Sequence, residues 1–150
     1  MRNSLASLVA IALAALFVAP AIVRAQSAET SGPPDGSKLY LYNCLACHQA
    51  AGQGMPNMAP ALKGNAIVEG DPALLIQILL KGAAAVLPED RPKFGASTMD
   101  SFYYKMNDEE MAAVLNYVRK TFGKGEKTAT VNAKEVAAAR AKMDAEAAGK

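Results

Sequence analysis

Hydrophobic side chains recur with helical spacing most clearly in the last third of this chain, where the pattern predicts a long helix. Five apolar residues lie three or four positions apart there and form one face: Met111, Val114, Leu115, Val118 and Phe122. Asn107 precedes them with Glu110 three residues later, the arrangement of a capping box, and Gly123 follows them. We expect a helix over residues 107–122 whose apolar face belongs to the core.

A first helix is predicted over residues 35–48, with Asp35 or Ser37 as its N-cap. Three residues spaced by four positions share one stripe of this helix: Gly36, Tyr40 and Cys44. Because glycine has no side chain, Gly36 permits the close approach of another backbone to the start of this helix.

A second helix is predicted to begin at Asp71 and Pro72, which are typical of an N-cap and a first turn, and to end at Gly82. Its apolar face comprises Leu74, Leu75, Ile78 and Leu79. Glycine and proline interrupt the helical pattern on both sides of it, which predicts a loop over residues 49–65 and a long loop over residues 83–106. Long loops without secondary structure usually carry a function.

The segments that flank these elements are predicted to make few contacts with the core. Residues 26–34 are small and polar and contain a proline pair, which is typical of an exposed leader. Residues 124–150 are predicted as a linker followed by an alanine-rich helix over residues 132–147, capped by Asn132. Its larger apolar residues are few: Val131, Val136 and Met143. We therefore expect this helix to lie loosely on the domain or to fray.

Residues 1–25 have the organisation of a secretory signal peptide. Arg2 supplies a positive charge, residues 5–19 form an apolar run without a charged side chain, and a cleavage site is predicted after Ala25. An uncleaved membrane anchor is the alternative, but an apolar run of about 15 residues falls short of the roughly 20 that span a bilayer. The sequence therefore predicts export to the periplasm, with no membrane span in the mature chain.

Length and charge narrow the classes of protein to be considered. The chain has 150 residues and no internal repeat, which predicts one folded domain over residues 35–123. Removal of residues 1–25 would take away Arg2 and Arg24 and no acidic residue, so basic side chains would balance the 14 acidic ones. A neutral chain without a basic stripe argues against nucleic-acid binding.

Both cysteines and the single histidine of the chain occur in one run, Cys44-Leu45-Ala46-Cys47-His48. This C-x-x-C-H pattern is typical of covalent c-type haem attachment, with both thiols at one porphyrin edge and the histidine on the iron. A redox dithiol of the thioredoxin type would need a βαβ pattern, and a zinc site would need more cysteine or histidine ligands. Because both cysteines lie in the motif, no thiol remains for a structural disulfide elsewhere. We expect one haem c, with its iron, as the cofactor.

Six methionines after His48 are candidates for the second axial ligand of the iron: Met55, Met58, Met99, Met106, Met111 and Met143. Met55 and Met58 follow His48 so closely that the chain between them is too short to pass around the haem edge. Met111 lies on the core face of the predicted helix, and Met143 lies in the tail. Met106 directly precedes the Asn107 cap, where an apolar residue packs against the first helical turn. Met99 has no such role, and Phe102 follows it by three residues, so we predict Met99 as the ligand, with Phe102 beside the haem.

In this order, these pieces resemble the class I cytochrome c family over residues 35–123, with a weaker resemblance over residues 131–140. The resemblance implies an all-α fold of about three core helices around one covalently bound haem, followed by the helical tail. It implies that the carbonyl of Pro60 accepts a hydrogen bond from His48. It also implies that Met99 and Phe102 belong to the family's distal methionine segment, which leads into the last core helix.

The resemblance further predicts where the first and last core helices cross, at Gly36 and Tyr40 on one and at Val114 and Tyr117 on the other. Two residues depart from the family pattern. Asp100 stands where the family usually has proline, which leaves the loop after Met99 less stiff, and Phe122 stands where relatives often have tryptophan. Residues 83–98 contain no landmark of the family.

On these grounds we expect a periplasmic one-electron carrier, and not an enzyme, with His48 and Met99 as axial ligands. A periplasmic dehydrogenase would donate its electrons, and a terminal oxidase or another cytochrome would accept them. Contact with such redox partners would use the haem edge near Cys47 and an apolar rim made of Ala50, Ala51, Met55 and Met58.

Two alternatives stay open. The first is a dedicated cytochrome subunit bound to one periplasmic dehydrogenase, with residues 83–98 or the tail as its docking element. The near-neutral net charge favours the dedicated subunit, since freely diffusing carriers often rely on electrostatic steering. The second is a haem enzyme or sensor, peroxidase-like or gas-binding, whose iron has an open sixth site.

Overall fold

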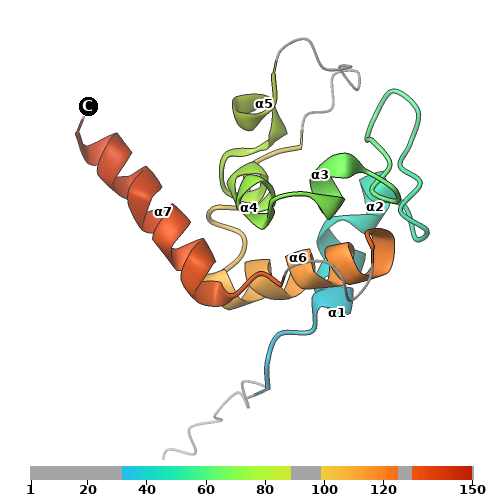
Figure 1. Cartoon of the computed structure of the whole chain (residues 1–150), viewed down its shortest axis with the longest axis horizontal. Coiled ribbons are helices and arrows are strands. Elements are labelled where there is room, and N and C mark those ends of the chain that lie inside the picture. Colours follow the sequence, from blue (N-terminus) through green and yellow to red (C-terminus); the bar gives the residue numbers. More distant parts are fainter. Residues whose placement is uncertain (1–31, 89–98, 125–129, 150) are drawn as a thin grey trace, which may run out of the picture. The chain divides into compact units, whose positions relative to one another are not determined.

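The computed structural model describes residues 32–88, 99–124 and 130–149 (Figure 1). They belong to one compact unit of the chain, Gly32–Lys150. The predicted signal peptide, its cleavage site after Ala25 and most of the predicted leader lie outside the described residues. Parts of the predicted long loop and of the predicted linker lie outside them as well.

Within the described residues the chain forms seven helices and no strand. The helices are α1 (Gly36–Asn43), α2 (Leu45–His48), α3 (Ala66–Glu69), α4 (Pro72–Lys81), α5 (Ala83–Val86), α6 (Asp108–Phe122) and α7 (Ala133–Ala148). One isolated β-bridge joins Met55 to Ala59. The all-α fold expected from the sequence is confirmed. No helix among the described residues combines the length and the hydrophobicity that a membrane span requires.

The helices α4, α6 and α7 lie where the sequence predicts them and carry the predicted caps. The side chain of Asp71 accepts a hydrogen bond at the start of α4. In α6, Asn107 Oδ1 accepts from the N–H of Glu110 at 2.8 Å, and Glu110 Oε2 accepts from the N–H of Asn107 at 2.9 Å. Asn132 and Glu135 form the same reciprocal capping box at the start of α7.

The predicted first helix is divided at Cys44, which ends α1 and precedes α2. Its backbone angles, φ −121° and ψ −31°, lie outside the helical range. The N–H of Cys44 donates to the carbonyl of Tyr40 at 2.9 Å, and its own carbonyl accepts from the N–H of His48 at 2.9 Å. The prediction of one continuous helix to His48 is therefore wrong. The change lies in the torsions of one residue, and no glycine or proline indicates it.

Two single-turn helices, α3 and α5, occupy segments for which the sequence predicts no helix. Asn65 caps α3, where its side chain accepts a hydrogen bond from the N–H of Ile67 at 2.9 Å. The helix α5 lies at the start of the predicted loop over residues 83–106, so that prediction is wrong for its first residues. Four residues are too few to show a helical period in the sequence.

The helix α1 packs across α6 (Figure 1), and the two backbones meet at Gly36. A Cβ atom at Gly36 would overlap the carbonyl oxygen of Ala113 and would lie 3.0 Å from the Cβ of Tyr117. The predicted crossing at Tyr117 is therefore present. Ala113, and not Val114, makes the closest approach to Gly36, while Val114 is 1% exposed and lies in the core. Glycine is needed here because two helix backbones meet.

The helix α7 packs firmly on the domain, so the prediction of a loosely attached tail is wrong. Val131 and Val136 are 3% and 0% exposed. The side-chain amide of Asn116 in α6 donates to the carbonyl of Val131 at 2.7 Å and accepts from its N–H at 2.8 Å. The apolar face of α7 is thin, as predicted, but side chain to backbone hydrogen bonds supplement it, and hydrophobic spacing does not report such contacts.

Arg119 of α6 is 2% exposed and joins α6 to α3 and to Gly70, which follows α3. Its Nη1 donates to the carbonyl of Val68 at 2.9 Å and its Nη2 to the carbonyl of Gly70 at 3.0 Å. A buried guanidinium needs such acceptors because its charge cannot be lost. Its position in the sequence, four residues after Leu115 and three before Phe122, places Arg119 on the buried side of the helix, but its charge predicts an exposed side chain.

Candidate functional site

The C-x-x-C-H motif occupies the turn from α1 into α2. Cys44 is the N-cap of α2, and Cys47 and His48 are its last two residues. The N–H of Cys47 donates to the carbonyl of Cys44 at 3.2 Å. Both thiols are half-buried and free. A single turn therefore presents two unpaired thiols and an imidazole within five consecutive residues.

The surroundings of the thiols argue against the redox and zinc interpretations of the motif. Burial, with a smaller contribution from Cys47, raises the pKa of the Cys44 thiol to about 11. Reactive dithiol sites depend instead on a cysteine whose pKa is lowered. In the described part of the chain, no three side chains of histidine, cysteine, aspartate or glutamate gather into a metal-binding group.

His48 is held in one orientation by the loop that follows it. Its side chain is buried, and Nδ1 lies 3.0 Å from the carbonyl oxygen of Pro60. A carbonyl oxygen only accepts, so Nδ1 carries the proton and donates, which leaves the lone pair on Nε2. Burial lowers the pKa of His48, and the bond to Pro60 opposes this shift. The imidazole ring is therefore neutral, and its Nε2 lone pair is available to bind a metal ion.

The loop over residues 49–65 folds back on itself and thereby brings Pro60 to His48. The N–H of Gly54 donates to the carbonyl of His48 at 3.0 Å, and the N–H of Leu62 donates to the carbonyl of Gly52 at 2.8 Å. Gly52 has a φ of +66°, and a Cβ atom there would lie 2.5 Å from the ring of Phe122. Glycine is required at this position by both the torsion and the ring.

Three aromatic rings, those of Tyr40, Tyr117 and Phe122, pack together next to the motif. The ring centroid of Tyr40 lies 5.4 Å from that of Tyr117 and 5.2 Å from that of Phe122. The hydroxyl of Tyr40 donates to the carbonyl of Gln49 at 2.7 Å, directly after His48. Burial raises the pKa of Tyr40 to about 12, with smaller contributions from Cys44 and Tyr117. Tyr40 thus fixes the backbone at the end of the motif.

Met99 and Phe102 lie in residues 99–107, the stretch that leads into α6 and is called here the Met99 segment. Both side chains are half-buried and pack against the core. The N–H of Phe102 donates to the carbonyl of Leu79 at 2.7 Å, and the carbonyl of Met99 accepts from the N–H of Ala83 at 2.9 Å. The Met99 segment is thereby attached to the end of α4 and the start of α5.

Met106, near the other end of the Met99 segment, is more deeply buried than Met99. Its side chain is 5% exposed and lies in the core, as the predicted packing role at the entrance of α6 requires. Its N–H donates to the carbonyl of Phe102 at 3.1 Å. Of the other candidate methionines, Met111 is 0% exposed and Met58 is 39% exposed. Met99, by contrast, is only half-buried and packs against the buried cluster without belonging to it.

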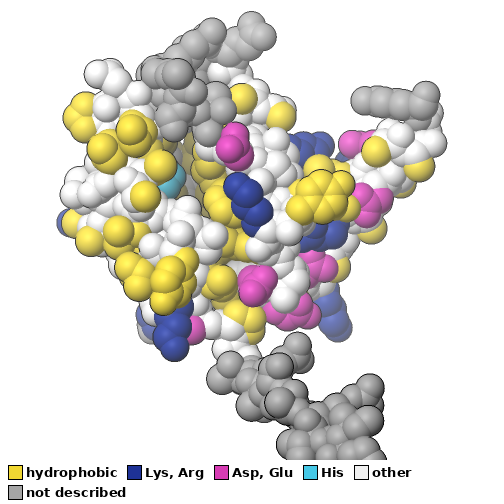
Figure 2. Space-filling view, turned by 180° about the vertical axis from the view of Figure 1, so that it is seen from behind, with side chains coloured by type: hydrophobic (Ala, Val, Ile, Leu, Met, Phe, Trp, Pro, Cys, Tyr) yellow, Lys and Arg dark blue, Asp and Glu magenta, His cyan; other side chains and the backbone are white. Residues whose placement is uncertain are grey.

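A hollow with largely hydrophobic visible walls lies beside the chain's single histidine, as Figure 2 shows. Of the side chains predicted to form a rim near Cys47, Ala50 and Ala51 are exposed, Met58 is 39% exposed and Met55 is half-buried. Apolar walls with a few fixed polar groups are typical of a site for a large organic ligand.

Residues 34–122 match the family model for cytochrome c, and this range includes the motif, Pro60 and all of α6. The chain belongs to the cytochrome c family. The resemblance found over residues 35–123 is thereby confirmed, and the family implies haem c, with its iron, as the cofactor. The structure brings together Cys44, Cys47, His48 and Pro60, and it places Met99 and Phe102 together in a second segment.

The cytochrome c domain is similar to proteins of two kinds. It is 37% identical over 107 residues to the gluconate 2-dehydrogenase cytochrome c subunit of Pantoea cypripedii, covering 70% of this chain and 24% of that protein. It is 37% identical over 89 residues to the alcohol dehydrogenase (quinone) cytochrome c subunit of Gluconobacter oxydans, covering 59% and 18%. It is 37% identical over 97 residues to cytochrome c-552 of Thermus thermophilus, covering 62% and 72%. The chain thus spans about a quarter or less of the two dehydrogenase subunits.

The residues of this cytochrome c domain fit haem c. Covalent attachment requires two free thiols, and Cys44 and Cys47 are free on one turn. An axial histidine must offer an unprotonated ring nitrogen, and the bond from Nδ1 to Pro60 leaves Nε2 of His48 in that state. The hydrophobic hollow beside His48 suits the apolar faces of a porphyrin.

Sequence reasoning missed two contacts that support this site. The four-residue spacing of Gly36, Tyr40 and Cys44 predicts a shared face, but not that the Tyr40 hydroxyl reaches the carbonyl of Gln49. The glycines of residues 49–65 predict a loop, but not that Gly52 makes room for the ring of Phe122, which lies far away in the sequence.

Proposed function

We propose that this protein carries single electrons through one haem c, attached at Cys44 and Cys47, with His48 and Met99 as axial ligands. The observation that carries the proposal is the buried hydrogen bond between His48 Nδ1 and the carbonyl of Pro60, at 3.0 Å. It leaves Nε2 as the ligand atom on the same turn as two free thiols. Membership of the cytochrome c family supports electron transfer rather than catalysis.

Each residue of the proposed site has its own task. When bound, haem c supplies an iron that gains and loses one electron. His48 offers its Nε2 lone pair, and Pro60 keeps the ring in one orientation and one tautomer. Met99 offers a thioether sulfur, the partner of histidine that raises the reduction potential in cytochromes c. Phe102, half-buried in the same segment as Met99, limits the access of water.

Redox proteins are the proposed partners, with a periplasmic dehydrogenase as donor and a terminal oxidase or another cytochrome as acceptor. The signal peptide predicted over residues 1–25 supports a periplasmic location. The exposed side chains of Ala50, Ala51 and Met58 offer a small apolar area near Cys47. Small contact areas suit the weak, quickly reversible encounters of electron-transfer proteins.

A second candidate is a dedicated cytochrome subunit of one dehydrogenase complex. The names of two similar proteins, the cytochrome c subunits of a gluconate 2-dehydrogenase and of a quinone-dependent alcohol dehydrogenase, favour it. Fractionation of periplasm and membrane extracts distinguishes the candidates. A dedicated subunit copurifies with a dehydrogenase in fixed ratio, whereas a free carrier separates from it.

Covalent attachment and one-electron chemistry are tested on the purified protein. We expect the haem colour to stay with the denatured chain through acid-acetone extraction, and a redox titration to fit one electron per chain. The double variant Cys44→Ala, Cys47→Ala should yield little folded protein, because the porphyrin fills much of the core that a chain of this size can build. Haem that is extracted into the solvent from the wild type would reject the proposed attachment.

A further inference from the structure

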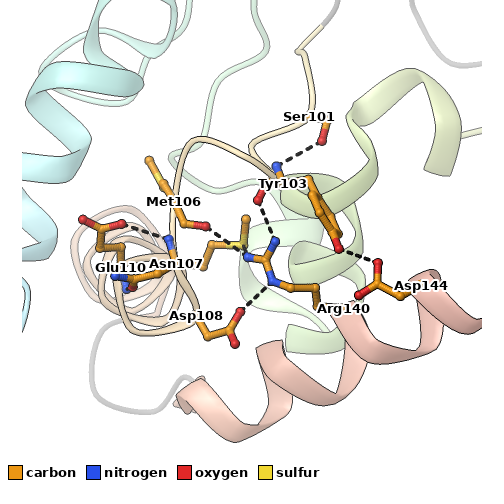
Figure 3. A network of polar contacts seen from close by, with 9 residues as sticks. Ser101, Tyr103, Met106, Asn107, Asp108, Glu110, Arg140 and Asp144 are labelled. Carbon is orange, nitrogen blue, oxygen red and sulfur yellow. Dashed lines mark hydrogen bonds and ion pairs between the residues drawn. The ribbon is translucent and has the colours of Figure 1, made fainter.

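The helix α7 lies outside the range that matches the family model, residues 34–122, yet it holds the Met99 segment (Figure 3). Arg140 donates from Nη1 to the carbonyl of Tyr103 at 2.6 Å and from Nη2 to the carbonyl of Met106 at 3.0 Å. Its Nε lies 2.8 Å from Oδ1 of Asp108, at the start of α6. One side chain therefore joins two points of the Met99 segment to the helix that follows it.

The geometry of Arg140 suits this task. A guanidinium is planar and presents its donors in fixed directions, so it can hold two carbonyls at a set separation. The carbonyls of Tyr103 and Met106 lie in non-helical backbone, where no helix ladder provides them with a donor. The side chains of Arg140 and Asp108 are only 18% and 26% exposed, which shields these contacts from water. Hydrogen bonds from an ionised donor are stronger than those between neutral groups.

Tyr103 is held by two successive turns of α7. The guanidinium carbon of Arg140 lies 4.5 Å from the centroid of the Tyr103 ring. The hydroxyl of Tyr103 donates to Oδ1 of Asp144, four residues further along α7. Tyr103 lies in the middle of the Met99 segment. Displacement of the segment therefore breaks these two contacts of Tyr103, together with the hydrogen bonds from Arg140 to the carbonyls of the segment.

The opposite side of the Met99 segment is attached to α4. The hydroxyl of Ser101 donates to the carbonyl of Leu80 at 2.5 Å and accepts from the N–H of Tyr103 at 3.1 Å. Lys81 at the end of α4 lies 3.8 Å from Glu146 of α7, which links the two flanking helices. The Met99 segment is therefore held between α4 and α7, and Arg140 makes the largest number of these contacts on the α7 side.

We propose that Arg140 is a positioning residue for Met99, and that α7 holds the Met99 segment closed through it. This inference rests on the proposed ligation of the iron by Met99. Release of Met99 from the iron requires movement of the segment, and that movement breaks the contacts of Arg140 with Tyr103 and Met106. Contacts made only in the closed state shift the equilibrium towards that state.

Binding of imidazole to the ferric protein measures this equilibrium. Imidazole reaches the iron only after Met99 has left, so its apparent dissociation constant varies inversely with the fraction of open molecules. We expect Arg140→Met, which keeps an unbranched chain and removes every donor, to bind imidazole at least tenfold more tightly than the wild type. Lys142→Met removes an exposed cation from the same helix and is the matched control, with unchanged affinity.

Amide hydrogen exchange gives a second readout that does not involve the iron. The N–H of Met106 donates to the carbonyl of Phe102 inside the Met99 segment. In Arg140→Met we expect this amide to exchange at least tenfold faster, while that of Leu115 in the core of α6 keeps its wild-type rate. Arg140→Lys keeps the charge beside Asp108 but has no fork that spans both carbonyls. It should change both readouts in the same direction by a smaller factor, and it provides the test if Arg140→Met does not fold.

The outcomes separate this inference from the proposed function. Wild-type affinity for imidazole in the folded Arg140 variants rejects the positioning role and leaves ligation by Met99 intact, whatever the rate of exchange. Exchange of the Met106 amide at the wild-type rate rejects the role as well, because the segment is then held without Arg140. If the ferric wild type lacks the sulfur-to-iron charge-transfer band, ligation by Met99 fails, and the positioning role fails with it.

Discussion

The carbonyl oxygen of Pro60 lies 3.0 Å from Nδ1 of His48, although the two residues are 12 positions apart in the chain. This contact decides which nitrogen of the single histidine carries the proton and which one can bind a metal. It is possible only because the intervening loop returns to the motif through the bonds of Gly52 and Gly54. The chemistry of the motif therefore depends on a loop that contains none of its residues.

Replacement of Met99 by alanine tests the second axial ligand. We expect Met99→Ala to abolish the sulfur-to-iron charge-transfer band of the ferric protein and to lower the reduction potential, because the thioether that raises the potential is lost. The ferrous form should bind carbon monoxide readily at the vacated position. Optical spectra, a redox titration and carbon monoxide binding check the three changes.

Met106→Ala is the matched control, since Met106 lies in the same segment but is buried in the core. It should leave the three observables nearly unchanged and lower the free energy of unfolding by about 2–5 kcal/mol. Loss of the band in Met106→Ala alone would reject Met99 as the ligand and keep the electron-carrier function. Rapid carbon monoxide binding by the wild type would instead favour the haem enzyme or sensor.

Gly36→Ala tests the crossing of α1 and α6. The added Cβ would overlap the carbonyl oxygen of Ala113, which is part of a helix backbone and cannot move without disturbing that helix. We expect a loss of about 1–3 kcal/mol in the free energy of unfolding, as for other overpacked sites, measured by denaturant titration. Gly32→Ala is the control with unchanged stability, since a Cβ there meets no atom within 4 Å. Equal stability of the two variants would mean that the helices separate without cost.

Tyr40→Phe tests the buried hydroxyl through the dependence of stability on pH. Burial raises the pKa of Tyr40 from 10.0 to about 12 in the folded state, so folding favours its protonated form. That contribution is complete below pH 10.0 and is lost as the pH rises through about 12. Below pH 10.0 the variant should be less stable by about 1 kcal/mol, the usual value of a lost hydrogen bond.

The difference in unfolding free energy between wild type and Tyr40→Phe should therefore shrink between pH 10.0 and about 12. Comparison of the two proteins cancels the titration of the other tyrosines and the lysines. A difference that stays constant over this range would mean that the hydroxyl of Tyr40 reaches water in the folded protein.

Much of the site could be predicted because its elements are local in the sequence. The C-x-x-C-H run, the capping boxes at Asn107 and Asn132, and the helix start at Asp71 each depend on residues within one helical turn. The caps form because side chains make hydrogen bonds with unpaired backbone groups a few residues away, so they can be predicted from the sequence. The break in the first helix at Cys44 is the exception, since it lies in backbone torsions that no residue type there signals.

Contacts between distant parts of the chain could not be predicted from hydrophobic spacing. The alanine-rich pattern of α7 suggests a weakly attached helix, yet Asn116 and Arg140 attach it through hydrogen bonds to backbone groups. Polar contacts of this kind depend on direction and distance in space, and residue order contains neither. The buried guanidinium of Arg119 is a further example, with acceptors about 50 positions away.

Local patterns were enough to predict the helical fold class, the starts of α4, α6 and α7 and the residues of the C-x-x-C-H motif, because helical periodicity, caps and motif spacing act within a few residues. The packed fold is needed to show that Ala113 rather than Val114 approaches Gly36 most closely, and that Arg140 contacts the backbone of the Met99 segment. Those contacts bring together groups far apart in the chain. Their geometry exists only after the core has packed and fixed where each loop and helix lies.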